Sequence, residues 1–280
     1  MVVEVRRARN LTLIALVIIV LGTIWFLVSG SPEEKSLTLA TTTSTQDSGL
    51  LDVLVPAFEK ETGIKVKVIA VGSGQAMELG KRGDADVLLV HSPQAEQEFV
   101  DGGYGVDRKP VMHNVFLIVG PKSDPAGVKG SKDASKAFRT IAERKAKFIS
   151  RGDDSGTHKK ELGLWEKAGV KPQGDWYVES GQGMGDTLLM ASELGAYTLT
   201  DEATYLSMAP KLQLEVMVQG DKALSNPYSV IAVNPEKHKN VHYKAATQFI
   251  KFITGEKGQS VIASFGRDKF GKSLFIPDAK

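Results

Sequence analysis

Short apolar segments alternate along most of this chain with segments that carry apolar residues at helical spacing. "IKVKVIAV" (64–71) alternates between apolar and polar residues, and "ADVLLVH" (85–91) is a short apolar run. "GLLDVLVPAFEKETG" (49–63) instead repeats its apolar residues every three or four positions and ends at a glycine. Period two predicts a strand and period 3.6 a helix. Their alternation predicts an α/β fold with a mostly parallel sheet.

Two longer apolar stretches have no turn residues inside them. "VMHNVFLIVGP" (111–121) could leave a first lobe and enter a second, and "YSVIAVNPE" (228–236) could cross back. A chain of 280 residues is long enough for either one large domain or two lobes.

The N-terminus indicates export. Arg6, Arg7 and Arg9 precede nineteen uncharged residues, 11–29, and "VSGS" (28–31) offers small residues where a signal peptidase could cut. Arginines before an apolar run are typical of a signal peptide or a membrane anchor, and both alternatives stay open. Residues 1–35 are therefore expected to form this segment and a linker. Residues 36–280 are expected to work outside the cytoplasmic membrane, in the periplasm or at its extracellular face.

The composition excludes several classes of function. The 35 basic and 33 acidic residues give a formal charge of +2, which does not favour a nucleic-acid partner. The chain has no cysteine, so it has no disulfide, thiol nucleophile, cysteine zinc site or lipidated cysteine. The five histidines form no H-E-x-x-H pair. We expect no bound metal cation and no cofactor.

Three loops rich in hydroxyl groups or glycine follow predicted strands and precede predicted helices. The first loop is "TTTSTQDSG" (41–49), the second "VGSGQ" (71–75) and the third "SRGDDSGTH" (150–158). The first turn of a helix has backbone N–H groups without partners at its positive end, where an anion can bind. Arg151 could add a charged fork of donors. Each loop alone is more typical of ordinary helix capping, but the three together favour an anion site.

Two other patterns, one typical of a hydrolase and one typical of a nucleotide-binding loop, have weaker support in the sequence. Ser155 and His158 have the spacing of a nucleophile and its base, which would make the protein an exported serine hydrolase. No G-x-S-x-G turn surrounds Ser155, and no sequence motif identifies a carboxylate that would pair with His158. "SGQGMGDT" (180–187) lacks the glycine pattern and lysine of a nucleotide loop. We interpret it as another helix-opening turn, placed at the edge of a cleft.

The chain resembles the tungstate-binding proteins of bacterial ABC uptake systems (the TupA type). The resemblance covers roughly 36–280 and lies in "TTTS" after the first strand, "GDADVLLVH" (83–91), "VMHNVFLIVGP" and "SRGDDSGTHKKELGLW" (150–165). It implies a type II periplasmic-binding-protein fold with two α/β lobes, a central cleft and two hinge crossings, and no enzyme activity. The implied lobes are 36–114 plus 229–280 and 115–228, with hinges near 112–120 and 224–232.

The resemblance also implies a ligand, contacts and partners. The protein would capture tungstate, or molybdate, and deliver it to a permease driven by an ATPase subunit; we expect a monomer. The matching motifs assign the oxyanion contacts to Thr42, Thr43, Ser73, Arg151, Ser155 and Thr157. The R-x-x-x-S-G-T element also resembles the anion loop of phosphate-binding proteins, so a phosphate or sulfate type of site remains the alternative.

Tungstate and phosphate differ in whether they carry a proton at neutral pH. Tungstate carries no proton at neutral pH and needs only donors, whereas a phosphate site needs a carboxylate that accepts the phosphate's own proton. Asp153 and Asp154 lie inside the third loop. We expect both to point away from the ligand, where they would cap the next helix or pair with Lys159 or Lys160. The sequence does not separate tungstate from molybdate, which share shape and charge.

Overall fold

The computed structural model describes residues 36–279, which form one compact unit. The predicted signal or anchor segment, 1–35, lies outside the described residues. No helix within 36–279 combines the length and the apolar character that a membrane span requires.

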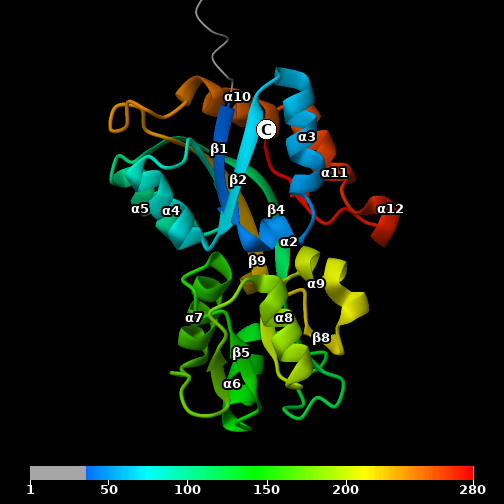
Figure 1. The fold of residues 1–280 in the computed structure, drawn as a ribbon. Helices are drawn as coiled ribbons and strands as arrows, with labels where there is room; N and C mark the ends of the chain where they lie inside the picture. Colours follow the sequence, from blue (N-terminus) through cyan, green and yellow to red (C-terminus); the bar gives the residue numbers. More distant parts are fainter. Residues whose placement is uncertain (1–35, 280) are drawn as a thin grey trace, which may run out of the picture. The chain divides into compact units, whose positions relative to one another are not determined.

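Strands and helices alternate as the sequence predicts (Figure 1). The strands are β1 (Ser36–Thr42), β2 (Lys65–Val71), β3 (Val87–Val90), β4 (Gly105–Pro121), β5 (Phe148–Ser150), β6 (Tyr177–Glu179), β7 (Thr198–Asp201), β8 (Leu214–Val218), β9 (Ser225–Val233) and β10 (Ile276–Pro277). The α-helices are α2 (Thr43–Asp47), α3 (Leu51–Thr62), α4 (Ser73–Arg82), α5 (Pro93–Asp101), α6 (Ala134–Glu143), α7 (Gly156–Ala168), α8 (Met184–Glu193), α9 (Glu202–Met208), α10 (Tyr243–Thr254), α11 (Glu256–Ser264) and α12 (Arg267–Phe270), with two 3-10 turns, η1 (Ala209–Lys211) and η2 (Lys222–Leu224).

The first lobe is a sheet covered on both faces. β1 lies between β2 and β3 and runs parallel to both, and β9 pairs antiparallel with β3. Side chains of α4 and α5 pack on one face, and those of α3, α10 and α11 pack on the other (Figure 1). The sheet is therefore mixed rather than mostly parallel, because β9 returns from the second lobe antiparallel to both of its neighbours, β3 and β4.

β4 belongs to both lobes. Its first part pairs with β9, and its last residues pair with β7 and β8 of the second lobe. Side chains along a strand alternate between faces, and here both faces are buried. Phe116 and Ile118 pack with α6 and α7, whereas Leu117 and Val119 pack with α8 and α9.

The two crossings run side by side as paired strands (Figure 1). Asn114 of β4 lies opposite Asn226 of β9, and Val115 lies opposite Ser225. The type II arrangement of two lobes joined by two crossings is present, and both predicted apolar stretches are crossing strands. The lobe boundaries expected at 114/115 and 228/229 fall within these two strands and stay a prediction.

Candidate functional site

The three loops that the sequence singles out meet in space. Arg151 Nη2 of the third loop donates to Thr43 Oγ1 of the first loop over 3.1 Å. The Gly74 amide of the second loop donates to the Asp154 carbonyl of the third over 3.3 Å. The loops approach so closely that Gly72 has no room for a side chain. A Cβ there would lie 3.0 Å from the Asp153 carbonyl oxygen. The loops come from both lobes, so the site lies between them.

Three buried donors at this junction have no hydrogen-bond partner. Among residues 36–279, five buried side-chain polar atoms lack a partner, and three of these are Ser73 Oγ, Arg151 Nε and Thr157 Oγ1. All three residues were predicted as ligand contacts. An unsatisfied buried polar group costs about 1–3 kcal/mol. Such a cluster indicates a site that is complete only when a ligand accepts these hydrogen bonds.

The other three predicted residues have local partners. Thr42 caps α2, where its Oγ1 accepts from the Thr45 amide over 3.3 Å. Ser155 caps α7, where its Oγ accepts from the His158 amide over 3.2 Å. Thr43 Oγ1 accepts from Arg151. Each hydroxyl accepts in these bonds, so none of the three bonds uses the hydroxyl's own hydrogen. All six contacts stay predictions.

The two aspartates of the third loop differ from each other. Asp154 forms the predicted ion pair with Lys159, at 3.4 Å. The expectation that Asp153 points away is wrong, because its carboxylate accepts from Arg151 Nη2 and from the Ser155 amide. The loop turns back through two left-handed residues, Gly152 and Asp154, with φ of 60° and 57°. This turn places the Asp153 carboxylate against the Arg151 guanidinium and fixes its orientation.

Ser155 and His158 are not arranged as a nucleophile and its base. His158 Nδ1 accepts from the Asp154 amide over 3.1 Å, and Ser155 Oγ is used by the His158 backbone. Both side chains therefore accept hydrogen bonds from backbone amides at the start of α7. This geometry gives no support to the hydrolase alternative.

The N-terminus of a fourth helix, α8, contacts the first loop. α8 begins at Met184, which confirms the helix-opening turn predicted for 180–187. The Gly185 amide donates to Asp47 Oδ2 across the lobes over 3.0 Å, and burial raises the pKa of Asp47. Sequence reasoning missed Asp47 because its role depends on the opposite lobe.

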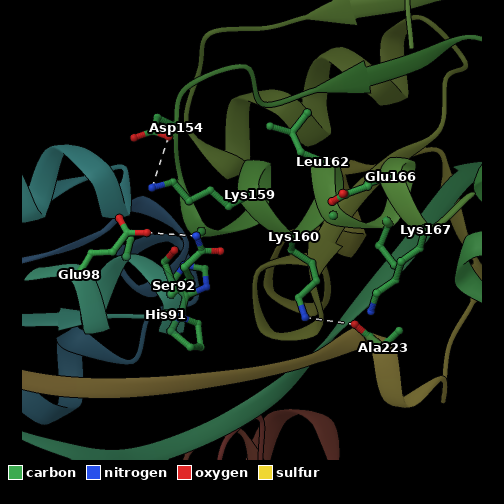
Figure 2. A pocket seen from close by; sticks show the side chains of 16 residues that line it. His91, Ser92, Glu98, Asp154, Lys159, Lys160, Leu162, Glu166, Lys167 and Ala223 are labelled. Atoms are coloured by element: carbon green, nitrogen blue, oxygen red, sulfur yellow. Dashed lines mark hydrogen bonds and ion pairs between the residues drawn. The ribbon is translucent and has the colours of Figure 1, made fainter. Parts of the chain in front are cut away.

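A cavity of about 590 Å³ opens beside the third loop, between α5 and α7 (Figure 2). His91, Ser92 and Glu98 line it from the first lobe. From the second lobe, Lys159, Lys160 and Lys167 line it. Lys160 Nζ donates to the Ala223 carbonyl over 3.1 Å, and burial lowers the pKa of Lys160. No cluster of side chains within 36–279 has the composition of a metal-cation site.

Gly156, the first residue of α7, provides a test of lobe contact. A Cβ at Gly156 would lie 2.7 Å from the His91 backbone oxygen of the first lobe. Gly156→Ala should therefore keep the lobes apart and weaken anion binding at least tenfold, measured by calorimetric titration. Gly163→Ala, in the same helix with open space around it, should leave binding unchanged and stabilise the protein by about 1 kcal/mol. Equal affinities for the two variants would contradict this arrangement.

The PBP superfamily domain matches residues 29–257 of the chain. The tungstate-binding protein TupA of Peptoclostridium acidaminophilum is 54% identical over 254 residues, which cover 90% of this chain and 89% of that protein. The chain belongs to the TupA family within the PBP superfamily. The tungstate-binding protein TupA of Campylobacter jejuni is 46% identical over 85% of this chain and 89% of its own length.

A solved structure with a similar sequence has the same fold. The structure of the tungstate ABC transporter protein from Geobacter sulfurreducens is 53% identical and superimposes with a TM-score of 0.77, over 83% of this chain and 99% of that one. The chain is therefore a substrate-binding protein of a transport system and not an enzyme. Members of this family work outside the cytoplasm, which agrees with the expected location of residues 36–280.

Proposed function

We propose that the protein binds tungstate between its two lobes and delivers it to an ABC permease. The observation that supports this most is the convergence of Ser73 Oγ, Arg151 Nε and Thr157 Oγ1, which are buried donors without partners. A tetrahedral dianion without a proton needs donors only. The Asp153 carboxylate of the third loop is already engaged by Arg151 and the Ser155 amide.

Charge and hydrogen bonding give a reason for tight binding. Arg151 is only 2% exposed, so its guanidinium would face the anion with little competition from water. Hydrogen bonds to charged groups contribute about 1.5–3 kcal/mol each, and a nanomolar complex needs about 12 kcal/mol. Donors from Thr43, Ser73, Ser155 and Thr157 together with Arg151 are sufficient for that total.

Capture by closure follows from the origin of these donors. Thr43 and Ser73 belong to the first lobe, and Arg151, Ser155 and Thr157 to the second. An anion that bonds to both groups binds the closed arrangement more tightly than the open one, and this difference drives closure. The closed monomer would then be recognised by the permease, and the partner ATPase would power import. The cargo is tungstate or molybdate, and no cofactor takes part.

The experiment is calorimetric titration of the purified, ligand-stripped protein with tungstate, molybdate, sulfate and phosphate in separate runs. Tight binding of one tungstate per chain, with weaker sulfate and phosphate, is the expected result. Equal affinity for molybdate would keep the mechanism and broaden the cargo to both anions. A preference for phosphate would assign to Asp153 the role of proton acceptor. Folded protein that binds none of the four would refute the proposal.

A further inference from the structure

A single row of hydrogen bonds connects the two crossing strands to the first loop. It runs through the side chains of Asp201, Asn114, Asn226, His91 and Ser44. Every one of these residues is buried. The row begins at Asp201, the last residue of β7 in the second lobe, passes through β4, β9 and the residue after β3, and ends in α2 of the first lobe. Both interlobe strands and the anion loop are therefore joined by side chains as well as by backbone.

The donors and acceptors fix the direction of this row. The Asp201 carboxylate caps α9 by accepting from the Thr204 amide, and it also accepts from Asn114 Nδ2 at 3.4 Å. Asn114 therefore turns its oxygen toward Asn226, whose Nδ2 donates to it over 2.7 Å. Asn226 in turn presents its oxygen to His91 Nδ1 at 2.8 Å. An amide oxygen only accepts, so His91 must carry a proton on Nδ1.

The other ring nitrogen of His91 is then an acceptor. Burial lowers the pKa of His91 to about 4, so the ring is neutral at pH 7 and Nε2 has no hydrogen. Arg151 and Lys160 lower the pKa further, whereas the Asn226 hydrogen bond and the Asp153 charge raise it. Ser44 Oγ lies 3.2 Å from Nε2 and must donate to it.

This donation decides which hydroxyl of the first loop remains available. With its only hydrogen on His91, Ser44 can only accept from Thr42 Oγ1, 3.0 Å away. Thr42 then accepts from Thr45 Oγ1 at 2.7 Å, so these three hydrogens are used within the loop and at His91. Thr43 Oγ1 accepts from Arg151, and no hydrogen bond within residues 36–279 uses its own hydrogen.

We propose that His91 is a positioning residue for anion capture. As a neutral ring protonated on Nδ1, it takes the Ser44 hydrogen and leaves the Thr43 hydroxyl as the side-chain donor that the first loop offers to the anion. The proposal rests on the proposed function. It removes Thr42 from the contacts that the sequence predicts, because Thr42 becomes a residue that holds the loop.

The packing of His91 makes this arrangement depend on both lobes. Its ring stacks on Tyr228 of β9, with centroids 4.7 Å apart, and lies 6.2 Å from Phe116 of β4. From the second lobe, Gly156 approaches so closely that a Cβ would lie 2.9 Å from His91 Cε1. His91 also lines the cavity in Figure 2, opposite the lysines of α7. The ring therefore contacts the anion loop, both crossing strands and the start of α7.

The first test measures the tautomer in the ligand-free wild-type protein. Nitrogen-15 NMR of the histidine rings, with His91 assigned by its loss in His91→Asn, should show a protonated Nδ1 and a bare Nε2 between pH 5.5 and 8. A ring protonated on Nε2, or a cationic ring at pH 7, would overturn the proposal. This readout needs no ligand, so it stands even if the protein binds none of the four oxyanions and the proposed function fails.

The second test compares matched variants by titration with tungstate. Thr43→Val should weaken binding at least about tenfold, whereas Thr42→Ser, which keeps the hydroxyl, should stay within about threefold of wild type. Ser44→Ala removes the hydrogen given to His91 and should cost an intermediate factor, and it should also change the His91 nitrogen shifts. Ser48→Ala, whose hydroxyl donates to the Thr45 carbonyl in the same loop, is the control and should leave those shifts in place. Wild-type affinity in Thr43→Val would refute the assignment of the donor.

Discussion

Arg151→Ala should weaken tungstate binding by at least about a hundredfold while the ligand-free protein stays folded. The guanidinium is buried, and its Nε is one of the three unpartnered donors. Charge-assisted hydrogen bonds contribute about 1.5–3 kcal/mol each, and 1.4 kcal/mol is a factor of ten, so the loss of two such bonds gives the expected factor. Titration measures the affinity, and circular dichroism confirms the fold.

Two variants make this result specific. Arg151→Lys keeps the charge but loses the planar fork, so it should recover only part of the affinity. Arg139→Ala removes an exposed arginine of the same lobe, which donates to the Ala168 carbonyl, and should bind as wild type does. If Arg151→Ala bound tungstate with the wild-type dissociation constant, the anion would lie elsewhere.

Thr157→Val should stabilise the ligand-free protein and weaken the complex. Thr157 Oγ1 is buried without a partner, so the isosteric valine removes an unsatisfied group. Relief of that cost should raise the free energy of unfolding by about 1 kcal/mol. The same change deletes a donor to the anion and should reduce affinity about ten- to a hundredfold. Urea denaturation without ligand and titration with tungstate measure the two effects.

Thr187→Val is the matched control for stability. Thr187 is also buried in the first turns of a helix of the second lobe, but its Oγ1 has a partner, Ser180 Oγ at 2.8 Å. That substitution should lower the free energy of unfolding, because it removes the buried hydrogen bond between Thr187 and Ser180. Ser73→Ala should behave like Thr157→Val in the first lobe. A drop in ligand-free stability for both Ser73→Ala and Thr157→Val would mean that their hydroxyls have another role in the fold.

Periodicity was sufficient for most of the fold. The helix predicted to end at Gly63 ends there, because Gly63 adopts a left-handed φ of 70°. The strands 64–71 and 85–91 are present as β2 and β3. Periodicity did not give the antiparallel pairing of β9 with β3, because strand direction depends on the path of the chain through the second lobe. The two-residue strand β10 was too short for any pattern.

The site was predictable where a local motif carries it. The family resemblance assigned Ser73 and Thr157 as contacts at two helix starts, and each has a buried polar atom without a partner. Both contacts stay predictions. The side-chain direction of Asp153 was not predictable, because it follows from two left-handed residues in the short loop 151–155 between β5 and α7. Asp47 and His91 have no motif of their own. Their roles arise only when segments more than forty residues away in the sequence pack against them.

The paired crossing strands restrict how a bound anion can leave. β4 and β9 are hydrogen-bonded to each other on both sides of the asparagine pair, so the lobes are joined by a two-stranded ribbon and not by two separate loops. A hydrogen-bonded ribbon resists sliding of one strand along the other, because sliding breaks the register of the whole ladder. It bends across its face at much lower cost. We therefore expect release to be a single concerted bending event, so the residence time of the anion reflects the stiffness of this ribbon as well as the contacts within the site.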